Sequence, residues 1–214
     1  MLAVWQAADD IDVFESGWTF DHFYPIFSDP TGPCLEGWVT LTALAQATTR
    51  LRVGVLVTGI HYRHPAVLAN MASTLDIVSG GRLELGIGAG WNEEESGAYG
   101  IALGTVKERF DRFEEACEVL TGLLSQETTS FDGSFYRLTE ARNEPKGPQR
   151  PHPPICIGGN GEKRTCGSPP ATPTTGISSA ARRRSSPASA TCSLRTAPTS
   201  AVTRRTSCCR PMCG

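Results

Sequence analysis

The sequence predicts an α/β fold built on a parallel sheet. The first observation is that apolar runs alternate with amphipathic segments along residues 1–165. The second is that the run 51–60 is almost continuously apolar, as expected for a strand buried on both faces. This order implies right-handed βαβ units. A doubly wound sheet and a (β/α)8 barrel both satisfy these observations.

Six elements are expected in the first half of the chain. They are a helix over 2–16, a strand over 18–23, a helix over 36–49, a strand over 51–60, a helix over 64–81 and a strand over 82–90. The first helical pattern is amphipathic and stops at Gly17. Pro65 suits the first turn of the helix over 64–81, and Gly80 and Gly81 suit its end.

The clearest helical pattern begins at a capping box. Thr105 and Glu108 have the spacing at which each side chain can bond the backbone N–H of the other. Behind them, apolar residues recur at three- and four-residue steps, at Val106, Phe110, Phe113, Cys117, Leu120 and Leu124. This spacing predicts an amphipathic helix with one buried stripe.

A hairpin and one more strand complete the ordered part of the prediction. Residues 130–136 predict a small hairpin that turns at Asp132-Gly133. The apolar run 154–159 predicts a last buried strand, and residues 160–164 predict the start of a helix. The sheet therefore continues beyond the hairpin.

Residues able to do chemistry gather where the expected strands end. They are Asp21 and His22; Thr58, Gly59 and Ile60; Gly88, Ala89, Gly90, Trp91 and Asn92; and Gly158, Gly159, Asn160, Gly161 and Lys163. Both candidate folds place their sites at the carboxyl ends of strands. His22 could orient or transfer a proton, because histidine titrates near neutral pH. A structural role for a lone histidine is the alternative.

The glycine-rich stretches have two interpretations each. Gly158 to Gly161 at a helix start would leave backbone N–H groups free to cradle an anion, with Lys163 adding charge. A tight turn that binds nothing is the alternative. The stretch from Gly86 to Gly90 is not a dinucleotide-binding fingerprint, because Trp91 stands where the third glycine belongs. Its small residues would let a flat ring approach the backbone, or would serve close packing.

Metal binding is not expected. His61 and His64 flank Arg63, and no carboxylate completes a ligand set there. The cysteines lack a paired CxxC arrangement and have no histidine beside them.

The composition changes abruptly after Thr165. All 22 acidic residues lie before Cys166, and every Phe, Trp and Tyr lies at or before Tyr136. The segment 166–214 contains seven arginines and too few large apolar groups to offset the entropy of ordering it. We expect a disordered tail. Binding of nucleic acid by the arginines is the alternative, although no aromatic residues accompany them for base stacking.

Four stretches together resemble the luciferase-like monooxygenase family, and most closely its deazaflavin-dependent oxidoreductase branch. They are "TFDHF", "TTRLRVGVLVTGIHYRHPAVLANMASTLDIVSGGRLELGIGAGWNEEE", "ERFDRFEEACEVL" and "PPICIGGNGEKRT". The resemblance covers roughly residues 2–165 and is most specific from Arg50 to Glu95. It implies a partial (β/α)8 TIM barrel, running roughly from the first helix to the fifth strand.

The resemblance also implies roles for individual residues. His22 matches the active-site histidine after the second strand. Gly59-Ile60 matches a bulge under the coenzyme ring that often contains a non-prolyl cis peptide. Gly88 to Asn92 matches the ring-side loop, and Gly158 to Lys163 matches the phosphate loop. Asp21 and Thr58 are included with these cofactor-binding candidates.

The resemblance ends at both ends of this range. The chain begins inside the family's first helix, so we expect the first strand to be missing. After Thr165, a shift of the reading frame by one nucleotide allows codons to be chosen that encode amphipathic, family-like sequence over 166–178 and 183–194. We therefore expect residues 166–214 to be out-of-frame translation.

The implied function is an oxidoreductase that transfers hydride between a reduced coenzyme and a small organic substrate. The expected coenzyme is F420, a deazaflavin, and an FMN-dependent monooxygenase is the alternative. We expect a cytoplasmic location without a membrane span, and homo-oligomers among intact relatives. Because a half-barrel exposes strand edges and interior surface, we expect impaired activity and poor solubility. The alternative to an enzyme is a non-catalytic protein, either a non-functional remnant or a nucleic-acid binder with an arginine-rich tail.

Overall fold

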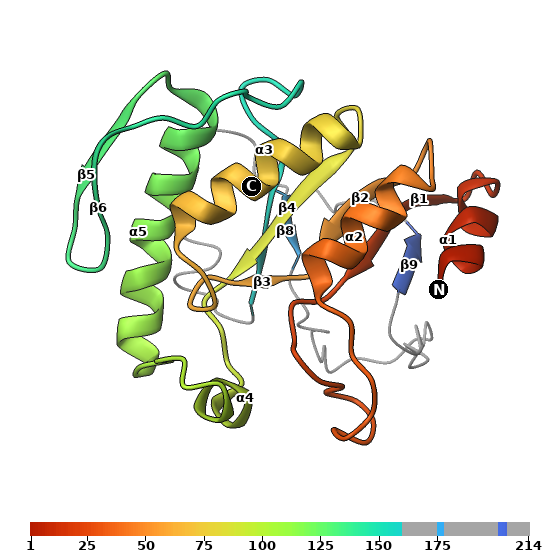
Figure 1. Ribbon diagram of the computed structural model, residues 1–214, viewed down its shortest axis with the longest axis horizontal. Coiled ribbons are helices and arrows are strands. Elements are labelled where there is room, and N and C mark those ends of the chain that lie inside the picture. Colours follow the sequence, from red (N-terminus) through yellow and green to blue (C-terminus); the bar gives the residue numbers. More distant parts are fainter. Residues whose placement is uncertain (160–174, 178–200, 205–214) are drawn as a thin grey trace, which may run out of the picture.

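The computed structural model describes residues 1–159, 175–177 and 201–204. Its helices are α1 (Leu2–Asp9), α2 (Gly37–Gln46), α3 (Pro65–Val78), α4 (Glu93–Ala98) and α5 (Val106–Ser125). Its strands are β1 (Phe14–Thr19), β2 (Arg52–Val55), β3 (Thr58–Gly59), β4 (Leu83–Gly88), β5 (Thr129–Asp132), β6 (Arg137–Ala141), β7 (Ile155–Gly158), β8 (Thr175–Ile177) and β9 (Ala201–Arg204). Alternating strands and helices confirm the predicted α/β class (Figure 1).

The described strands form one mixed sheet and one hairpin. The sheet has the order β8-β7-β4-β2-β1-β9, with β3 also paired to β4. Neighbours from β8 to β1 run parallel, whereas β9 is antiparallel to β1. The hairpin β5–β6 lies beyond α5, away from the sheet (Figure 1). The parallel part of the sheet therefore brings the carboxyl ends of β1, β3, β4 and β7 to one edge.

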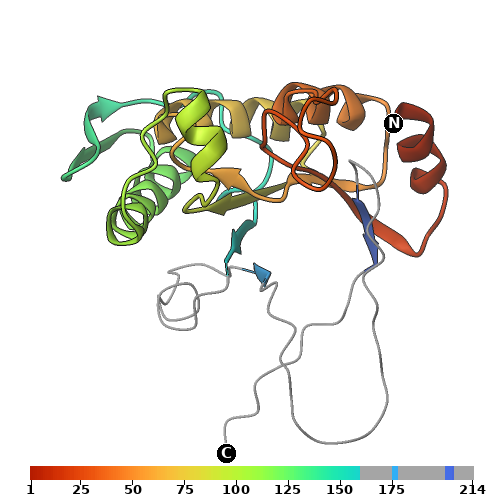
Figure 2. The ribbon, with the colours of Figure 1, turned by 90° about the horizontal axis from the view of Figure 1, so that it is seen from below.

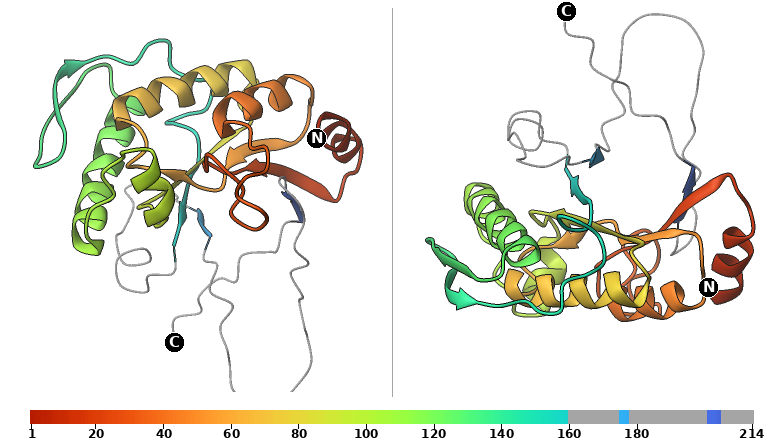
Figure 3. Two further views of the ribbon diagram at one scale, coloured as in Figure 1. Left: turned by 60° about the horizontal axis from the view of Figure 1, so that its bottom comes forward. Right: turned by 90° about the horizontal axis from the view of Figure 1, so that it is seen from above.

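Three helices form the layer that covers one face of the sheet. Figures 2 and 3 show α2 and α3 side by side over this face, with α5 next to α3. The core between the layers is aliphatic. Its fully buried side chains include Leu41, Leu68, Leu75, Leu83, Leu85, Ile87, Leu120 and Leu123. Burial of this surface is the main favourable contribution to folding of such a layered domain.

The first helix is shorter than predicted. It ends at Asp9, and β1 begins at Phe14, inside the segment expected to be helical. Arg50 explains this end, because its guanidinium donates hydrogen bonds to the carbonyls of Ala8, Asp9, Ile11 and Phe14. These bonds satisfy acceptors that a longer helix would have bonded internally. A contact 36 residues or more away in sequence therefore ends the helix.

The predicted strand over 51–60 is divided in two. β2 ends at Val55 and β3 comprises Thr58 and Gly59, with a cis peptide bond between Leu56 and Val57. Both short strands still pair with β4 in parallel register. The division leaves Leu56 exposed and Val57 half-buried at the strand ends.

Several local predictions are confirmed. Thr105 and Glu108 form the capping box at the start of α5. Gly80 and Gly81 follow α3 with positive φ values of 65° and 84°, as the end of a helix favours. The hairpin has Asp132 opposite Arg137, which closes a turn at Gly133.

Of the predicted tail, the structure describes only the short strands β8 and β9. The other residues of 166–214, and the helix start expected over 160–164, lie outside the described residues.

Candidate functional site

The predicted grouping of glycines at the strand ends is present. The β3–β4 register places Gly59 beside Gly88, and the β4–β7 register places Ile87 beside Ile157. Gly88 therefore lies between Gly59 on one neighbouring strand and Gly158 on the other. Three adjacent strands end in residues without side chains.

The side chain of Val57 fills the space that two of these glycines leave. A Cβ atom on Gly88 would lie 2.8 Å from Val57 Cγ2, and one on Gly158 would lie 2.7 Å from the same atom. Close packing, and not direct contact of a ring with the backbone, therefore explains Gly88 and Gly158. A flat ligand at this edge would rest on Val57.

The non-prolyl cis peptide differs in place from the one that the resemblance implied. It joins Leu56 to Val57, three residues before the expected Gly59-Ile60 bond. Ile60 is 2% exposed and its N–H donates to the Gly88 carbonyl at 3.0 Å. The side chain of Ile60 therefore belongs to the core and does not face the edge.

His22 is held by a buried carboxylate. Its Nδ1 lies 2.7 Å from Oε2 of Glu95, which is the third residue of the short helix α4. Glu95 is completely buried, whereas the His22 side chain is 13% exposed. The same carboxylate accepts the Phe23 N–H at 2.6 Å through Oε1 and the Tyr62 hydroxyl through Oε2. Glu95 thus joins the ends of β1, β3 and β4.

Hydrogen bonding decides the charge of Glu95. Burial alone raises the pKa of its carboxyl, but the hydrogen bonds from Tyr62, the Phe23 N–H and His22 outweigh burial and hold the pKa below its ordinary value. Burial and the bond to Glu95 together raise the pKa of Tyr62. Tyr62 is therefore a hydroxyl donor and Glu95 an ionised acceptor at neutral pH.

Asp21 has a different role from the one predicted. Its carboxylate accepts two hydrogen bonds from Arg63, at 2.6 Å and 2.8 Å, and one from the Gly59 N–H at 3.2 Å. Asp21 is 3% exposed, so its oxygens are not available to a cofactor. Burial favours neutral Arg63, but bonding and charge pairing with Asp21 outweigh burial and raise the pKa of the guanidinium. The pair anchors the β3 end to the β1 end.

Two more predicted cofactor ligands are used within the protein. Thr58 is fully buried, and its Oγ1 accepts a hydrogen bond from Trp38 Nε1 at 3.1 Å. The Asn92 side chain accepts the Glu95 N–H at 3.1 Å and so caps α4. These two side chains therefore hold the backbone of the site in place and are not directed at a ligand.

Aromatic rings flank His22. The Trp91 ring lies edge-on at 5.5 Å between centroids, and the Phe20 ring lies at 5.6 Å. Trp91 is 61% exposed, which is unusual for so large an apolar side chain. Ala89 and Gly90, which precede it, are half-buried. Of the predicted ring-side loop, Ala89 to Trp91 remain accessible to a ligand.

His61 lies on the inner side of the same loop. Its Nε2 is 3.1 Å from Ser96 Oγ, and Ser96 donates its own hydrogen to the Asn92 carbonyl at 2.7 Å. Burial, with the charges of Arg112 and Arg109, lowers the pKa of His61 to about 4. His61 is therefore neutral at pH 7. Within the described ranges no group of three His, Cys, Asp or Glu side chains is arranged to hold a metal ion.

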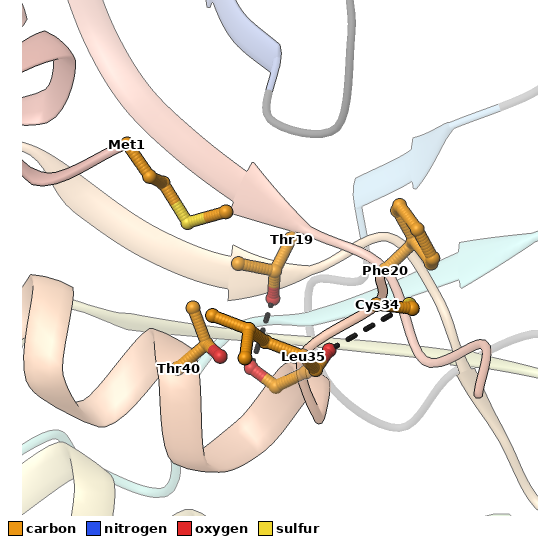
Figure 4. A pocket seen from close by; sticks show the side chains of 7 residues that line it. Met1, Thr19, Phe20, Cys34, Leu35 and Thr40 are labelled. Carbon is orange, nitrogen blue, oxygen red and sulfur yellow. Dashed lines mark hydrogen bonds between the residues drawn. The ribbon is translucent and has the colours of Figure 1, made fainter. Parts of the chain in front are cut away.

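A small hollow is lined in part by Phe20 (Figure 4), whose ring centroid lies 5.6 Å from that of His22. Its lining comprises Met1, Thr19, Phe20, Cys34, Leu35, Gly37 and Thr40. The Thr19 hydroxyl donates to the Gly37 carbonyl at 3.2 Å across it, and the Cys34 thiol donates to the His22 carbonyl at 3.4 Å. The hollow is mainly apolar and contains no ionised side chain.

The structure brings several of the predicted residues together at one edge of the sheet. His22, Ala89, Gly90 and Trp91 lie where predicted, and Asn160, Gly161 and Lys163 lie outside the described residues. Gly159 is half-buried directly after β7. Glu95, Tyr62 and Arg63 were missed. One sequence signal for Glu95 was its place three residues after Asn92, the spacing at which an Asn side chain can accept a backbone N–H at a helix start.

The accessible residues fit a planar, largely apolar ring. Val57 supplies an apolar support over Gly88 and Gly158, and Trp91 is an exposed aromatic wall beside a histidine with an anchored ring. A histidine at such a place can hold or accept a proton at the nitrogen that Glu95 does not use.

Comparisons with known proteins relate the chain to one protein family. A family model described as luciferase-like monooxygenase matches residues 4–165. The F420-dependent hydroxymycolic acid dehydrogenase of Mycobacterium tuberculosis is 34% identical over 164 residues, which are 75% of this chain and 44% of that protein. The FMNH2-dependent dimethylsulfone monooxygenase of Pseudomonas putida is 36% identical over 118 residues, which are 55% of this chain and 32% of that protein.

Solved structures give the same result. An F420-dependent secondary alcohol dehydrogenase in complex with an F420-acetone adduct superposes with a TM-score of 0.66 at 27% identity, covering 74% of this chain and 47% of that one. The monooxygenase RslO1 from Streptomyces bottropensis superposes with a TM-score of 0.63 at 29% identity, covering 73% and 46%. This chain spans less than half the length of these relatives. The described fold is part of a luciferase-like (β/α)8 barrel. In the part that the structure describes, no helix is long and apolar enough to cross a membrane.

Proposed function

Because the chain belongs to the luciferase-like monooxygenase family, we propose that its site serves hydride transfer between coenzyme F420 and a small organic substrate. The observation that carries the proposal is His22, with its ring anchored by Glu95 and flanked by Trp91 at the carboxyl ends of the strands. Relatives named as F420-dependent dehydrogenases support the choice of coenzyme.

The residues of this chain would contribute binding, orientation and proton handling. Val57 would support the ring of the coenzyme, and Trp91 would cover its edge and exclude water. His22 would hold a proton of the substrate through the ring nitrogen that faces away from Glu95. When bound, a deazaflavin supplies a carbon that accepts or donates hydride. The pair Asp21–Arg63 would keep the β3 end in place beneath the ring.

A second candidate is an FMN-dependent monooxygenase. It is favoured by the 36% identity with the FMNH2-dependent enzyme of Pseudomonas putida. A deazaflavin has carbon in place of the nitrogen next to the oxygen-reactive position of FMN, so it does not activate oxygen. The two candidates therefore differ in whether turnover consumes oxygen.

Activity of this chain alone is proposed to be impaired. The described sheet is open, since β8 and β9 lie at its two ends, and a barrel of this type closes with eight strands. Substrate contacts from the remainder of a complete barrel would be missing. A cytoplasmic location and homo-oligomerisation of intact relatives belong to this proposal and have only the resemblance as support.

Equilibrium titration tests the proposal. Purified chain would be titrated with oxidised and reduced F420 and, separately, with FMN and reduced FMN, and binding would be followed by quenching of the tryptophan fluorescence of the protein. Preferential binding of F420, with no oxygen uptake by the reduced coenzyme, is expected. Preferential binding of reduced FMN with oxygen uptake would select the second candidate instead.

A further inference from the structure

We propose that Glu95 is a positioning residue that fixes the tautomer of His22, with the proton on Nδ1 and the lone pair of Nε2 directed away from Glu95. The inference deepens the proposed function, because it assigns the state in which His22 meets a substrate. The tautomer of His22 is a property of the protein without ligand. Only the substrate preference derived from it rests on the proposed function.

The first step concerns what Glu95 can accept. An ionised carboxylate has no hydrogen to donate, so the 2.7 Å contact between Oε2 and His22 Nδ1 requires a proton on Nδ1. Burial opposes ionisation of Glu95, but the hydrogen bonds from the Tyr62 hydroxyl and the Phe23 N–H, with that from His22, outweigh burial and hold its pKa below the ordinary value, so that Glu95 is ionised near neutral pH. Neutral His22 therefore carries its hydrogen on Nδ1 and leaves Nε2 as an acceptor.

The second step concerns why Glu95 cannot turn away. Its Oε1 accepts the backbone N–H of Phe23 at 2.6 Å, and its Oε2 also accepts the Tyr62 hydroxyl. Its own N–H is bonded to the Asn92 side chain. These bonds come from three different parts of the fold, so the carboxylate has a fixed orientation before any ligand binds. Preorganisation of this kind is what a proton-transferring group requires.

The consequence is a substrate preference at Nε2. An acceptor nitrogen suits a substrate group that presents a hydrogen, such as the hydroxyl of an alcohol. In the oxidising direction the hydroxyl proton would pass to Nε2 while the hydride on the same carbon passes to the coenzyme, leaving a carbonyl group. The reverse reaction returns both to the carbonyl.

Substitution of Glu95 by Gln gives a sharp test, because the Phe23 backbone N–H can only donate a hydrogen bond and therefore fixes the orientation of the Gln amide. The amide oxygen of Gln would remain opposite this backbone donor, and the amide nitrogen would replace Oε2. The NH2 group would then donate to His22 Nδ1 and move the histidine proton to Nε2. Tyr62→Phe is the matched control, since it removes one bond to the same oxygen and leaves the pair between His22 and Glu95.

The readout is the nitrogen NMR spectrum of the histidine rings, recorded on the whole chain without coenzyme above pH 7. His22→Gln assigns the signals of His22 among the four histidines. We expect His22 protonated mainly on Nδ1 in the unmodified chain and in Tyr62→Phe, and mainly on Nε2 in Glu95→Gln. Protonation on Nε2 in the unmodified chain would overturn the inference, and so would an unchanged tautomer in a folded Glu95→Gln variant.

The spectrum of the unmodified chain keeps the test decisive if Glu95→Gln fails to fold. The tautomer in the unmodified chain is then the deciding observation, because protonation on Nε2 is incompatible with the pair. A confirmed tautomer without binding of F420 or FMN would contradict the proposed function and leave the role of Glu95 intact.

Discussion

The carboxylate of Asp21 and the guanidinium of Arg63 form a bidentate ion pair, with N–O distances of 2.6 Å and 2.8 Å. The side chain of Asp21 is 2% exposed and that of Arg63 is 15% exposed. Because Asp21 also accepts the Gly59 N–H, this pair ties the end of β1 to the end of β3. It therefore supports the site from beneath without facing a ligand.

Asp21→Asn should destabilise the chain. The substitution leaves the buried guanidinium of Arg63 without its main counter-charge, and breaking a buried pair typically costs about 3–5 kcal/mol. We expect the free energy of unfolding to fall by about 3 kcal/mol, because Arg63 retains some contact with water. Urea unfolding at pH 7 measures this loss. Glu36→Gln is the control, since Glu36 lies 3.7 Å from Arg63 and is 41% exposed; an equal loss in both variants would contradict the account.

Acid should reveal the contribution of Asp9. Burial raises the pKa of this carboxyl, but hydrogen bonds from the backbone N–H groups of Thr49, Leu51 and Arg50 outweigh burial and lower it to about 2. The folded pKa is below the unfolded one, so the stabilisation is complete above about pH 4 and is lost as the pH falls towards 2.

The corresponding measurement compares the unmodified chain with Asp9→Asn in urea at several pH values. The stability difference should be largest above pH 4 and should shrink progressively as the pH is lowered. A difference that stays constant over this interval would show that the charge of Asp9 does not contribute.

Trp91 should account for nearly all tryptophan fluorescence that iodide can quench. All four tryptophans lie in the described residues, and Trp5, Trp18 and Trp38 are at most 5% exposed, whereas Trp91 is 61% exposed. Trp91→Phe should remove the quenchable fraction and change the free energy of unfolding little. Trp38→Phe is the control and should leave quenching unchanged. Strong quenching that persists in Trp91→Phe would mean that another tryptophan is exposed.

The gene sequence tests the proposal that residues 166–214 are translated out of frame. The match to the family model ends at residue 165, which is where the composition changes. A single-nucleotide shift after the codon of Thr165 should restore a continuous family match in the DNA. Close relatives that carry the same 49 residues in frame would refute the proposal.

Features that depend on neighbouring residues were predictable from the sequence. The capping box of Thr105 and Glu108 and the glycines after α3 are of this kind, because their signals lie within one turn of the element that they end. The parallel sheet and the edge where the candidate site lies also followed from the order of elements.

Features that depend on distant contacts were not predictable. Arg50 ends α1 from about 40 positions away, and Glu95 reaches His22 over 73 positions. Asp21 was placed in the correct region but given the wrong role, since nothing in its own neighbourhood shows that Arg63 lies against it. Side-chain pairs such as Asp21–Arg63 depend on how the strand ends come together in the folded chain, and neighbouring residues in the sequence do not indicate them.

The most direct test of the central claim is titration of the chain with oxidised F420 while the fluorescence of Trp91 is followed. The account predicts saturable quenching that Trp91→Phe abolishes, because the ring is proposed to bind beside His22 and Trp91. A cooperatively folded chain in which neither F420 nor FMN alters the Trp91 fluorescence at any concentration would contradict it.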